Sequence, residues 1–513
     1  MKRSLRPALM AGIIAAALAL TGCAAATDGD TDQSGESQVL RFGISGEAPV
    51  LKAGQEQGNL GFTMDAMLHR GLVSYDANGD VVPALAAEYE QVTPSEYRFT
   101  LREGLTFHDG TELTLESVKD SFEYFANPEN GSQRAVDFAR IAAVEPGEGN
   151  DFTITLTEND AAFLQVLANP ATPILPAAAL SPDAVANVGA GPFEFVSEEP
   201  GVGLTLKKFD GYYNADGVEL DGVDVSYYAD GAARVNALMG GDVDLIDYVP
   251  WESYDQLESA GYTVDAPLGP GLDVQFNHEK TPFDNPQVRE AIAYAIDREK
   301  IVANVFSGRA EPIYGQIVQP GGAFDTPLAT EGYEYDPEKA KALLSEAGFP
   351  DGFDTTLTST SQYAFMQDMA ISMKEDLDAV GIRTELVLPD WPTMMEALLT
   401  GNYDLTIGTV SSSIGDPSYL LSFVRPPAIT YPWGYDNPEV TSALESGRAA
   451  SDDAEQKKNY DRAFELIREE TPYAVLVQRS QGFAFTEDVD GFKTLPGLFV
   501  FFSALGVENV SKG

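Results

Sequence analysis

Cysteine, basic charge and long apolar runs are all scarce in this sequence. The only cysteine in 513 residues is Cys23, which excludes a disulfide framework and any zinc site built from cysteines. Lys and Arg number 32 against 80 Asp and Glu, for a net charge of −48. Nucleic acid is not expected as a partner, because phosphate binding needs basic patches. We expect the charge to maintain solubility outside the cell; the alternative is a field that favours cationic solutes.

Motifs of enzyme chemistry are also missing. The three histidines, His69, His108 and His278, are widely spaced and form no His-Glu-x-x-His zinc helix. The sequence has no phosphate-binding Gly-x-x-x-x-Gly-Lys loop and no Gly-x-Ser-x-Gly nucleophile elbow. We therefore expect no metal, no cofactor and no enzymatic activity. A nickel role for His278 and a surface hydrolase stay open as alternatives.

The first residues have the three-part layout of a secretory signal, a basic start, an apolar stretch and small residues. The apolar stretch, residues 8–20, is too short to span a bilayer. Leu20-Thr-Gly-Cys23 resembles the bacterial lipobox, which implies that residues 1–22 are a lipoprotein signal peptide and that the Cys23 thiol is lipidated. The alternative is an ordinary signal peptide that happens to contain a cysteine. Residues 23–38 are small and polar, and indicate a flexible tether. The lipid is then the only expected membrane link of the mature chain. The mature chain has a net charge of −51, because removal of residues 1–22 takes away three basic and no acidic residues.

Two segments 160 residues apart echo each other. Residues 237–245 and 397–405 share the pattern Ala-Leu-x-x-Gly-x-x-Asp-Leu. In each, the glycine, Gly241 or Gly401, is placed to end an amphipathic helix. The strands expected on either side of these helices are residues 223–228 and 243–249 in the first half, and 384–388 and 403–410 in the second. Two such units predict two α/β lobes with a ligand in the crevice at the carboxyl ends of their strands.

Further local patterns fill in the chain. Alternating apolar residues predict strands at 97–101 and 152–156, paired antiparallel, and a strand at 39–44. Residues 113–125 have helical periodicity, with Thr114 as the N-cap. Asn78-Gly79 predicts a tight turn.

An ordered series of motifs from about residue 39 onward resembles family 5 of the extracellular solute-binding proteins, the peptide/nickel-type receptors of ABC importers. The longest is residues 276–301, where a strand and a Pro-Phe turn precede a helix that starts at Pro286. The others are residues 72–76, 83–88, 101–110, 189–193, 335–344 and 434–438.

This resemblance implies an α/β, two-lobed fold like that of periplasmic binding proteins (type II, cluster C), with an extra subdomain inserted in lobe I. The solute is trapped when the lobes close. The implied boundaries are lobe I at 39–76, 189–274 and 479–513, the inserted subdomain at 77–188, and lobe II at 275–478.

The resemblance also implies where the ligand binds, and there this sequence departs from the family. In peptide-binding members an Asp holds the peptide's amino group, and alignment on Asp416 places Ser413 at that position. No basic residue lies in residues 358–363, where an Arg of dipeptide members grips the carboxylate. Ser411, Ser412 and Ser413 offer neutral hydrogen bonds instead, which suits longer peptides or neutral polar solutes. We also place Asp416 itself in the predicted site.

Aromatic residues and one carboxylate complete the predicted ligand site. Trp391 follows a strand of lobe II, where a ring could face the cleft, or simply pack in the core. Glu47, after the first strand, could face a cationic group or be a plain loop carboxylate. The further aromatic candidates are Tyr363, Tyr431 and Trp433.

The sequence thus predicts a monomeric, lipid-anchored receptor on the outer face of the cell membrane. It captures peptides of the oligopeptide type and delivers them to an ABC permease and ATPase complex. A sugar, a nickel chelate or an opine-like compound is the alternative solute. A signalling receptor is a further alternative.

Overall fold

The computed structural model describes residues 38–319, 322–412, 414–426, 428 and 430–513. The predicted signal peptide, Cys23 and Ser413 lie outside the described residues. Gln38–Gly513 forms one compact unit. None of its described helices is long and apolar enough to cross a membrane.

Lobe I is organised by a seven-stranded sheet in the order β12-β19-β11-β1-β10-β9-β8. The central strand β1 (Val39–Ile44) is confirmed as predicted, and its inward side chains Leu40, Phe42 and Ile44 are buried. The other strands are β8 (Phe193–Glu199), β9 (Gly203–Lys208), β10 (Gly222–Tyr227), β11 (Leu245–Ile246), β12 (Thr263–Asp265) and β19 (Phe483–Phe485). Its helices are α1 (Gly58–Leu68), α5 (Gly231–Gly240), α6 (Tyr254–Ser259) and the 3-10 helices η3 (Ala215–Gly217), η4 (Trp251–Ser253) and η6 (Gly497–Asn509).

The inserted subdomain has its own four-stranded antiparallel sheet in the order β4-β5-β7-β6. The predicted pairing of residues 97–101 with 152–156 is confirmed as β5 with β7. Thr114 caps α2 in a capping box with Ser117, as the sequence predicts. The elements are β4 (Ala86–Thr93), β5 (Glu96–Leu101), β6 (Ile141–Pro146), β7 (Asp151–Leu156), α2 (Leu115–Ala126), η1 (Pro128–Asn130), α3 (Ala135–Phe138), α4 (Phe163–Leu167) and η2 (Ala177–Ala179). Two small ribbons, β2 (Val73–Tyr75) with β3 (Val81–Pro83) and β20 (Val489–Asp490) with β21 (Ser511–Lys512), complete the strands outside lobe II.

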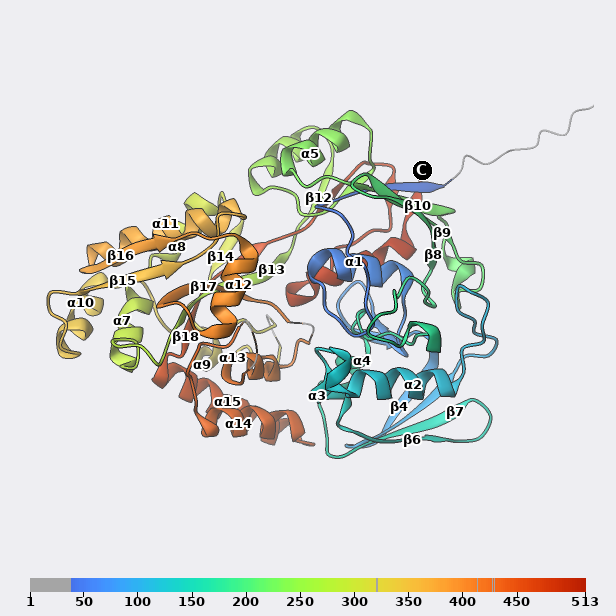
Figure 1. The fold of residues 1–513 in the computed structure, drawn as a ribbon, viewed down its shortest axis with the longest axis horizontal. Coiled ribbons are helices and arrows are strands. Elements are labelled where there is room, and N and C mark those ends of the chain that lie inside the picture. The colour runs from blue at the N-terminus through green and yellow to red at the C-terminus, as the bar shows by residue number, and fades with distance from the viewer. Residues whose placement is uncertain (1–37, 320–321, 413, 427, 429) are drawn as a thin grey trace, which may run out of the picture. The chain divides into compact units, whose positions relative to one another are not determined.

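Lobe II is organised by a six-stranded sheet in the order β14-β18-β13-β17-β15-β16. Helix α11 packs along β16 (Figure 1). The strands are β13 (Leu268–Phe276), β14 (Ala310–Pro312), β15 (Phe353–Thr358), β16 (Ile382–Val387), β17 (Leu405–Val410) and β18 (Tyr473–Ser480). The helices are α7 (Pro286–Ala295), α8 (Arg298–Val305), α9 (Pro327–Thr330), α10 (Pro337–Glu346), α11 (Ala364–Ala379), α12 (Trp391–Thr400), η5 (Pro417–Leu420), α13 (Leu421–Val424), α14 (Pro438–Ala449) and α15 (Asp453–Glu470).

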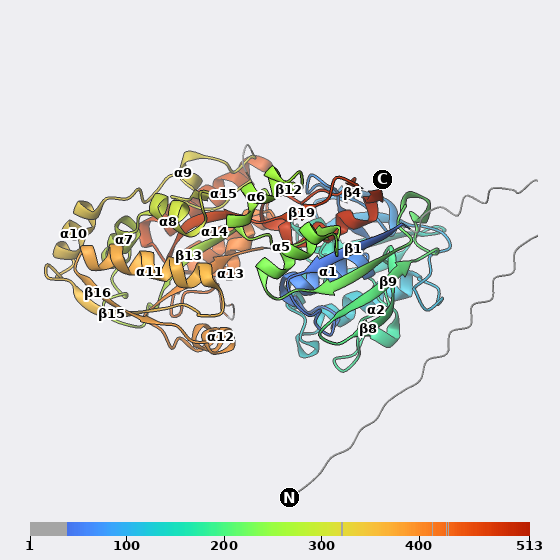
Figure 2. The same ribbon diagram turned by 90° about the horizontal axis from the view of Figure 1, so that it is seen from above.

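The two sequence echoes occupy equivalent places in the two sheets. In lobe I the parallel strands run in the order β11-β1-β10, and in lobe II in the order β17-β15-β16. Helix α5 joins the outer strands of the first triplet and packs against β1 and β11. Figure 2 shows α5 beside β1. Helix α12 joins those of the second. Gly241 and Gly401 end these helices with φ of 75° and 67°, where a side chain would be strained.

Strands β13 and β18 carry the chain between the lobes. β12 of lobe I leads into β13, and β18 leads into β19 of lobe I. The two strands pair antiparallel, with Gly271 opposite Gln478. The predicted boundaries at 274/275 and 478/479 fall inside these two strands, which both lie in the lobe II sheet.

A buried acidic residue lies on one face of β13. Leu272, Val274 and Phe276 face the apolar cluster formed with α7 and α11, so the alternation of a strand turns Asp273 and Gln275 to the other face. Asp273 is fully buried and accepts one hydrogen bond from Gln275, at 3.3 Å. The described residues offer it no ion pair, and burial raises the pKa of its carboxyl to about 7.

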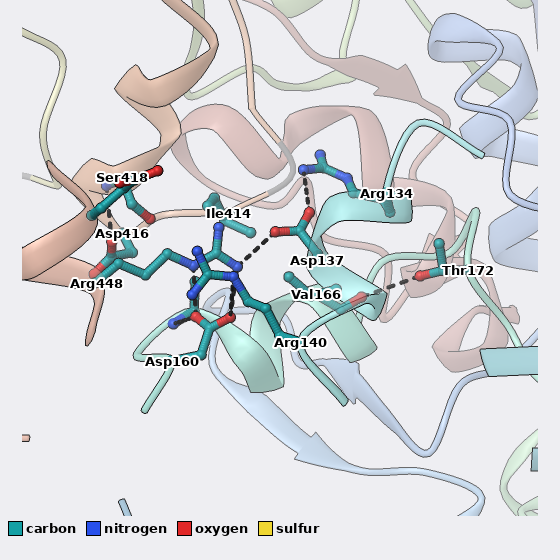
Figure 3. A network of polar contacts seen from close by, with 12 residues as sticks. Arg134, Asp137, Arg140, Asp160, Val166, Thr172, Ile414, Asp416, Ser418 and Arg448 are labelled. Carbon is teal, nitrogen blue, oxygen red and sulfur yellow. Dashed lines mark hydrogen bonds and ion pairs between the residues drawn. The ribbon is translucent and has the colours of Figure 1, made fainter. Parts of the chain in front are cut away.

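A cluster of ion pairs joins lobe II to the inserted subdomain (Figure 3). Arg448 of α14 donates from Nε to Asp160 at 2.6 Å and from Nη2 to Asp137 at 2.7 Å. All three residues are buried. Burial opposes the charge of Asp137, but Arg448 and Arg134 outweigh it and lower the pKa of Asp137. The backbone N–H of Ala161 also donates to the carbonyl of Arg448, at 2.9 Å.

We expect Arg448→Met to destabilise the folded chain by about 3–5 kcal/mol, because it removes the nearest cation from two buried carboxylates. Arg134, 3.4 Å from Asp137, and Arg140, 3.8 Å from Asp160, replace it only in part. Urea unfolding at pH 7 measures the loss. Arg425→Met is the matched control, because Arg425 pairs with Glu445 at the surface and its loss costs about 1 kcal/mol or less. Equal effects of the two variants contradict the role of Arg448.

The same cluster has a defined pH dependence. Because the pKa of Asp137 is lower in the folded chain than its ordinary value of 3.8, its stabilising contribution is complete above pH 3.8 and lost as the pH falls through the lowered pKa. The difference in stability between wild type and Arg448→Met should therefore shrink below pH 3.8.

We expect Asp273→Asn to stabilise the chain more at pH 8 than at pH 5. The pKa of Asp273 is raised, so its neutral form favours folding below pH 3.8, and this contribution is lost as the pH rises through about 7. The amide keeps the shape without the charge, and the full shift of three pH units corresponds to on the order of 4 kcal/mol. Urea unfolding at both pH values tests this, and an equal gain at pH 5 and pH 8 counts against charge burial as the cause.

Candidate functional site

The loops at the carboxyl ends of the parallel strands are the natural place for a ligand in this architecture. In lobe I these loops follow β1 and β11. In lobe II they follow β15, β16 and β17. The predicted site residues fall into three groups when they are placed on these loops.

The first group is Tyr363 and Trp391, two of the proposed site aromatics, which the structure brings together. The two rings meet edge to face at 5.3 Å between centroids, across the loops after β15 and β16. Their loops are tied by the N–H of Ser361, which donates to the carbonyl of Pro389 at 3.1 Å. Asp390 caps α12 by accepting from the N–H of Thr393. The Tyr363 ring is 39% exposed, so it is available to a solute.

The second group is the serine loop, residues 411–416, after β17. Ser411 and Ser412 are half-buried, and Ser412 Oγ accepts from the N–H of Ile414 at 3.1 Å. The N–H of Gly415 donates to the Gln165 side chain of the inserted subdomain, at 2.8 Å. Ser413 lies outside the described residues. This contact places Gly415 where lobe II meets the inserted subdomain.

Asp416 is placed inside lobe II. Its carboxylate accepts from the Ser418 N–H at 2.8 Å, from Gln456 at 3.3 Å and from the Tyr460 hydroxyl. Burial raises the pKa of this carboxyl. These contacts engage both oxygens and fix the turn that starts η5, which is the structural role that an Asp-Pro pair predicts at a helix start.

The third group lies away from the other two. Trp433 donates from its N–H to Tyr403 at 2.9 Å and from Nε1 to Glu279 at 3.1 Å. These neighbours lie at the Leu405 end of β17, whereas the serine loop follows its Val410 end, roughly 17 Å along the strand. Tyr431 is two residues from Trp433, and its hydroxyl donates to the carbonyl of Tyr435. The structure does not bring Trp433 and Tyr431 to the serine loop.

Glu47 belongs to lobe I. It is exposed in the loop after β1, and its Oε1 accepts from the N–H of Gly201 at 3.1 Å. That contact ties the loop to the β8–β9 hairpin.

Sequence reasoning missed two residues where the lobes meet, Arg479 and Tyr248. Arg479 is the last residue but one of β18 and is buried. Its guanidinium lies over Phe365 of lobe II at 5.3 Å and over Tyr248 of lobe I at 5.7 Å. The available signal was the polar run Gln478-Arg-Ser-Gln481 at the end of an otherwise apolar strand. Tyr248 leaves the sheet after β11 with φ of 46°, so the predicted strand 243–249 is shortened to two residues.

The histidines all serve the scaffold. Nε2 of His278 lies 3.0 Å from the carbonyl of Pro472, and burial lowers the pKa of its imidazole to about 4. His69 and His108 contact the carbonyls of Ala186 and Gly191. The described part of the chain contains no group of three or more His, Cys, Asp or Glu side chains that could hold a metal.

Comparison with known proteins places this architecture in a family. The family model described as bacterial extracellular solute-binding proteins, family 5 Middle, matches residues 80–430. The glutathione-binding protein GsiB of Escherichia coli (strain K12) is 30% identical over 450 residues, which cover 83% of this chain and 86% of GsiB.

Two solved structures are similar to this chain over nearly its whole length. AgaA of A. tumefaciens R10, in complex with agropinic acid, is 36% identical, with a TM-score of 0.84 over 93% of this chain and 99% of AgaA. The oligopeptide-binding protein AppA of Bacillus subtilis, in complex with a nonapeptide, is 23% identical, with a TM-score of 0.79 over 93% of this chain and 99% of AppA. The latter likeness shows the fold alone.

These matches confirm the predicted two-lobed fold and the family resemblance. Members of the family are transport receptors rather than enzymes. The chain belongs to family 5 of the bacterial extracellular solute-binding proteins and is the substrate-binding component of an ABC importer.

Proposed function

We propose that this receptor captures peptides of the oligopeptide type between its two lobes and delivers them to a membrane permease. The observation that carries the proposal is the character of the lobe II loops. They present half-buried serines at 411 and 412 and an exposed aromatic ring at Tyr363, while the carboxylate of Asp416 is engaged elsewhere. Neutral hydrogen-bonding groups and aromatic faces suit a peptide held along its backbone.

The relatives support this solute class. GsiB, which is named for glutathione binding, covers most of the chain at 30% identity. A second candidate, an opine-like acid, is favoured by AgaA, which binds agropinic acid and is 36% identical. Both candidates are small polar solutes and require no chemistry from the receptor.

The proposed location follows from the amino-terminal sequence. Lipidation of Cys23 anchors the mature chain at the outer face of the cell membrane, beside the permease and ATPase, and the receptor acts there as a monomer. The lipid is needed because a chain with this negative charge is repelled by an anionic membrane surface.

Native mass spectrometry of the freshly purified protein tests the solute class. We expect peptide masses to be released from the wild-type protein, and acidic opine masses if the second candidate holds. Isothermal titration with a tetrapeptide and with its N-acetylated form adds a direct test. Acetylation should change the affinity less than about threefold, because no free carboxylate of the serine loop receives the amino group; a loss of 100-fold contradicts the neutral serine contacts.

Cleavage products in the same titration samples point to the hydrolase alternative instead. The matched control is bovine serum albumin treated in the same way, which exposes a contaminating peptidase.

Cys23→Ala tests the anchor. We expect the variant to lose its lipid and to pass largely from the membrane fraction to the medium or periplasm, because the thiol is the attachment point. Immunoblots of the cell fractions measure this. Thr21→Ser, which keeps a small residue before the cysteine, is the control, and wild-type membrane retention of Cys23→Ala refutes the lipid anchor.

A further inference from the structure

Arg479 has an incomplete set of partners. It is 4% exposed. Nη1 donates to the Gln481 side chain, and Nη2 contacts the Tyr248 hydroxyl at 3.4 Å. Nε has no hydrogen-bond partner. The edge of the guanidinium formed by Nε and Nη2 is therefore almost unused, and this edge can donate two parallel hydrogen bonds to one carboxylate.

The other buried arginines of the described residues are fully engaged. Each of them either forms an ion pair with a carboxylate or donates to three or more backbone carbonyls. They are Arg70, Arg234, Arg289, Arg298 and Arg448. Within the described residues, Arg479 has no carboxylate as an ion-pair partner and no set of three backbone carbonyls. A buried cation without a counter-charge is costly, so its place in the fold calls for an anion from outside the chain.

The surroundings of Arg479 are aromatic on several sides. Its guanidinium lies 5.3 Å from the ring centre of Phe365, 5.7 Å from Tyr248 and 5.8 Å from Trp251. Trp251 is held in place by a hydrogen bond from Nε1 to the carbonyl of Ser480, at 2.7 Å. These rings stabilise the cation without neutralising it, and they exclude the water that would weaken its attraction for a carboxylate.

Arg479 also lies at the same edge of the lobe II sheet as the serine loop. Val410 pairs with Gly271, and Gly271 pairs with Gln478. Two strand spacings separate Val410 from Gln478, about 10 Å. Ser411 is the next residue after Val410, and Arg479 is the next residue after Gln478. Phe365 in turn contacts Tyr363, at 6.0 Å between ring centres, which links Arg479 to the exposed aromatic pair.

We propose that Arg479 anchors a carboxylate of the bound solute through its Nε–Nη2 edge, with the Tyr248 hydroxyl as an additional donor. The inference rests on the proposed function and narrows it to solutes that carry a carboxylate. The rest of the solute extends toward the serine loop and the ring of Tyr363. Because acidic residues outnumber basic ones 80 to 32, the field of the chain disfavours an anionic group in general, and a buried arginine without a counter-charge sets both the orientation and the selectivity.

The test compares peptides that differ only in this group. The probes are tetrapeptides with neutral side chains, each as the free acid and as the carboxyl-terminal amide, titrated calorimetrically into protein freed of carried-over solute by unfolding and refolding. Wild type should prefer the free acid by about 10- to 100-fold. Arg479→Met should lose this preference and bind both forms alike. Arg479→Lys keeps the positive charge but lacks the two parallel N–H donors of the guanidinium, so it should keep part of the preference for the free acid.

Arg383→Met is the matched control, because it removes one arginine from the lobe II surface, where Arg383 pairs with Asp354; it should retain the full preference. A wild-type protein that binds acid and amide equally, or an Arg479→Met protein with the full preference, overturns the carboxylate anchor and leaves the peptide receptor standing. If no peptide of either form binds to wild type, the proposed function fails and the anchor with it. If Arg479→Met does not refold, the comparison is made on Arg479→Lys, and an undiminished preference there overturns the inference.

Discussion

The antiparallel pairing of β13 with β18 is the constraint on which both lobes depend. These strands are neighbours in the lobe II sheet, and their ends lead directly into β12 and β19 of lobe I. Because backbone hydrogen bonds fix their register, the position of Gly271 against Gln478 also fixes where the two polypeptide crossings lie. The loops that follow β11, β15 and β17 are thereby brought to one place, although they are far apart in the sequence.

Acidic residues and buried arginines have different structural roles in this molecule. Most of the 80 acidic residues have no structural need of a partner, since a solvated carboxylate costs nothing. The few buried arginines are used where the chain must hold something together: Arg448 joins lobe II to the inserted subdomain, and Arg298 binds backbone carbonyls inside lobe II. A scarce cation left unpaired, as at Arg479, therefore stands out against a background in which the others are all engaged.

Much of the fold could be predicted from the sequence, because local signals carried it. The strand at Val39, the capped helix after Thr114 and the helix stops at Gly241 and Gly401 all depend on neighbouring residues, and all are confirmed. The family motifs supplied the two-lobed arrangement. The ends of β11 could not be predicted, because the apolar run continues to Val249 while Tyr248 turns out of the sheet with a positive φ.

The site was harder to predict, and the reason is physical. Tyr363 and Trp391 could be proposed because each lies just beyond a strand, and the ends of strands can be recognised in a sequence. In the sequence, Trp433 and Tyr431 are as good candidates as Tyr363 and Trp391. Whether their loop lies at the carboxyl or the amino ends of the sheet strands depends on the direction of the strands across the whole lobe. Arg479 was not predicted, because the reason to single it out is that it has no carboxylate partner. Only the packed structure shows which partners a buried side chain has.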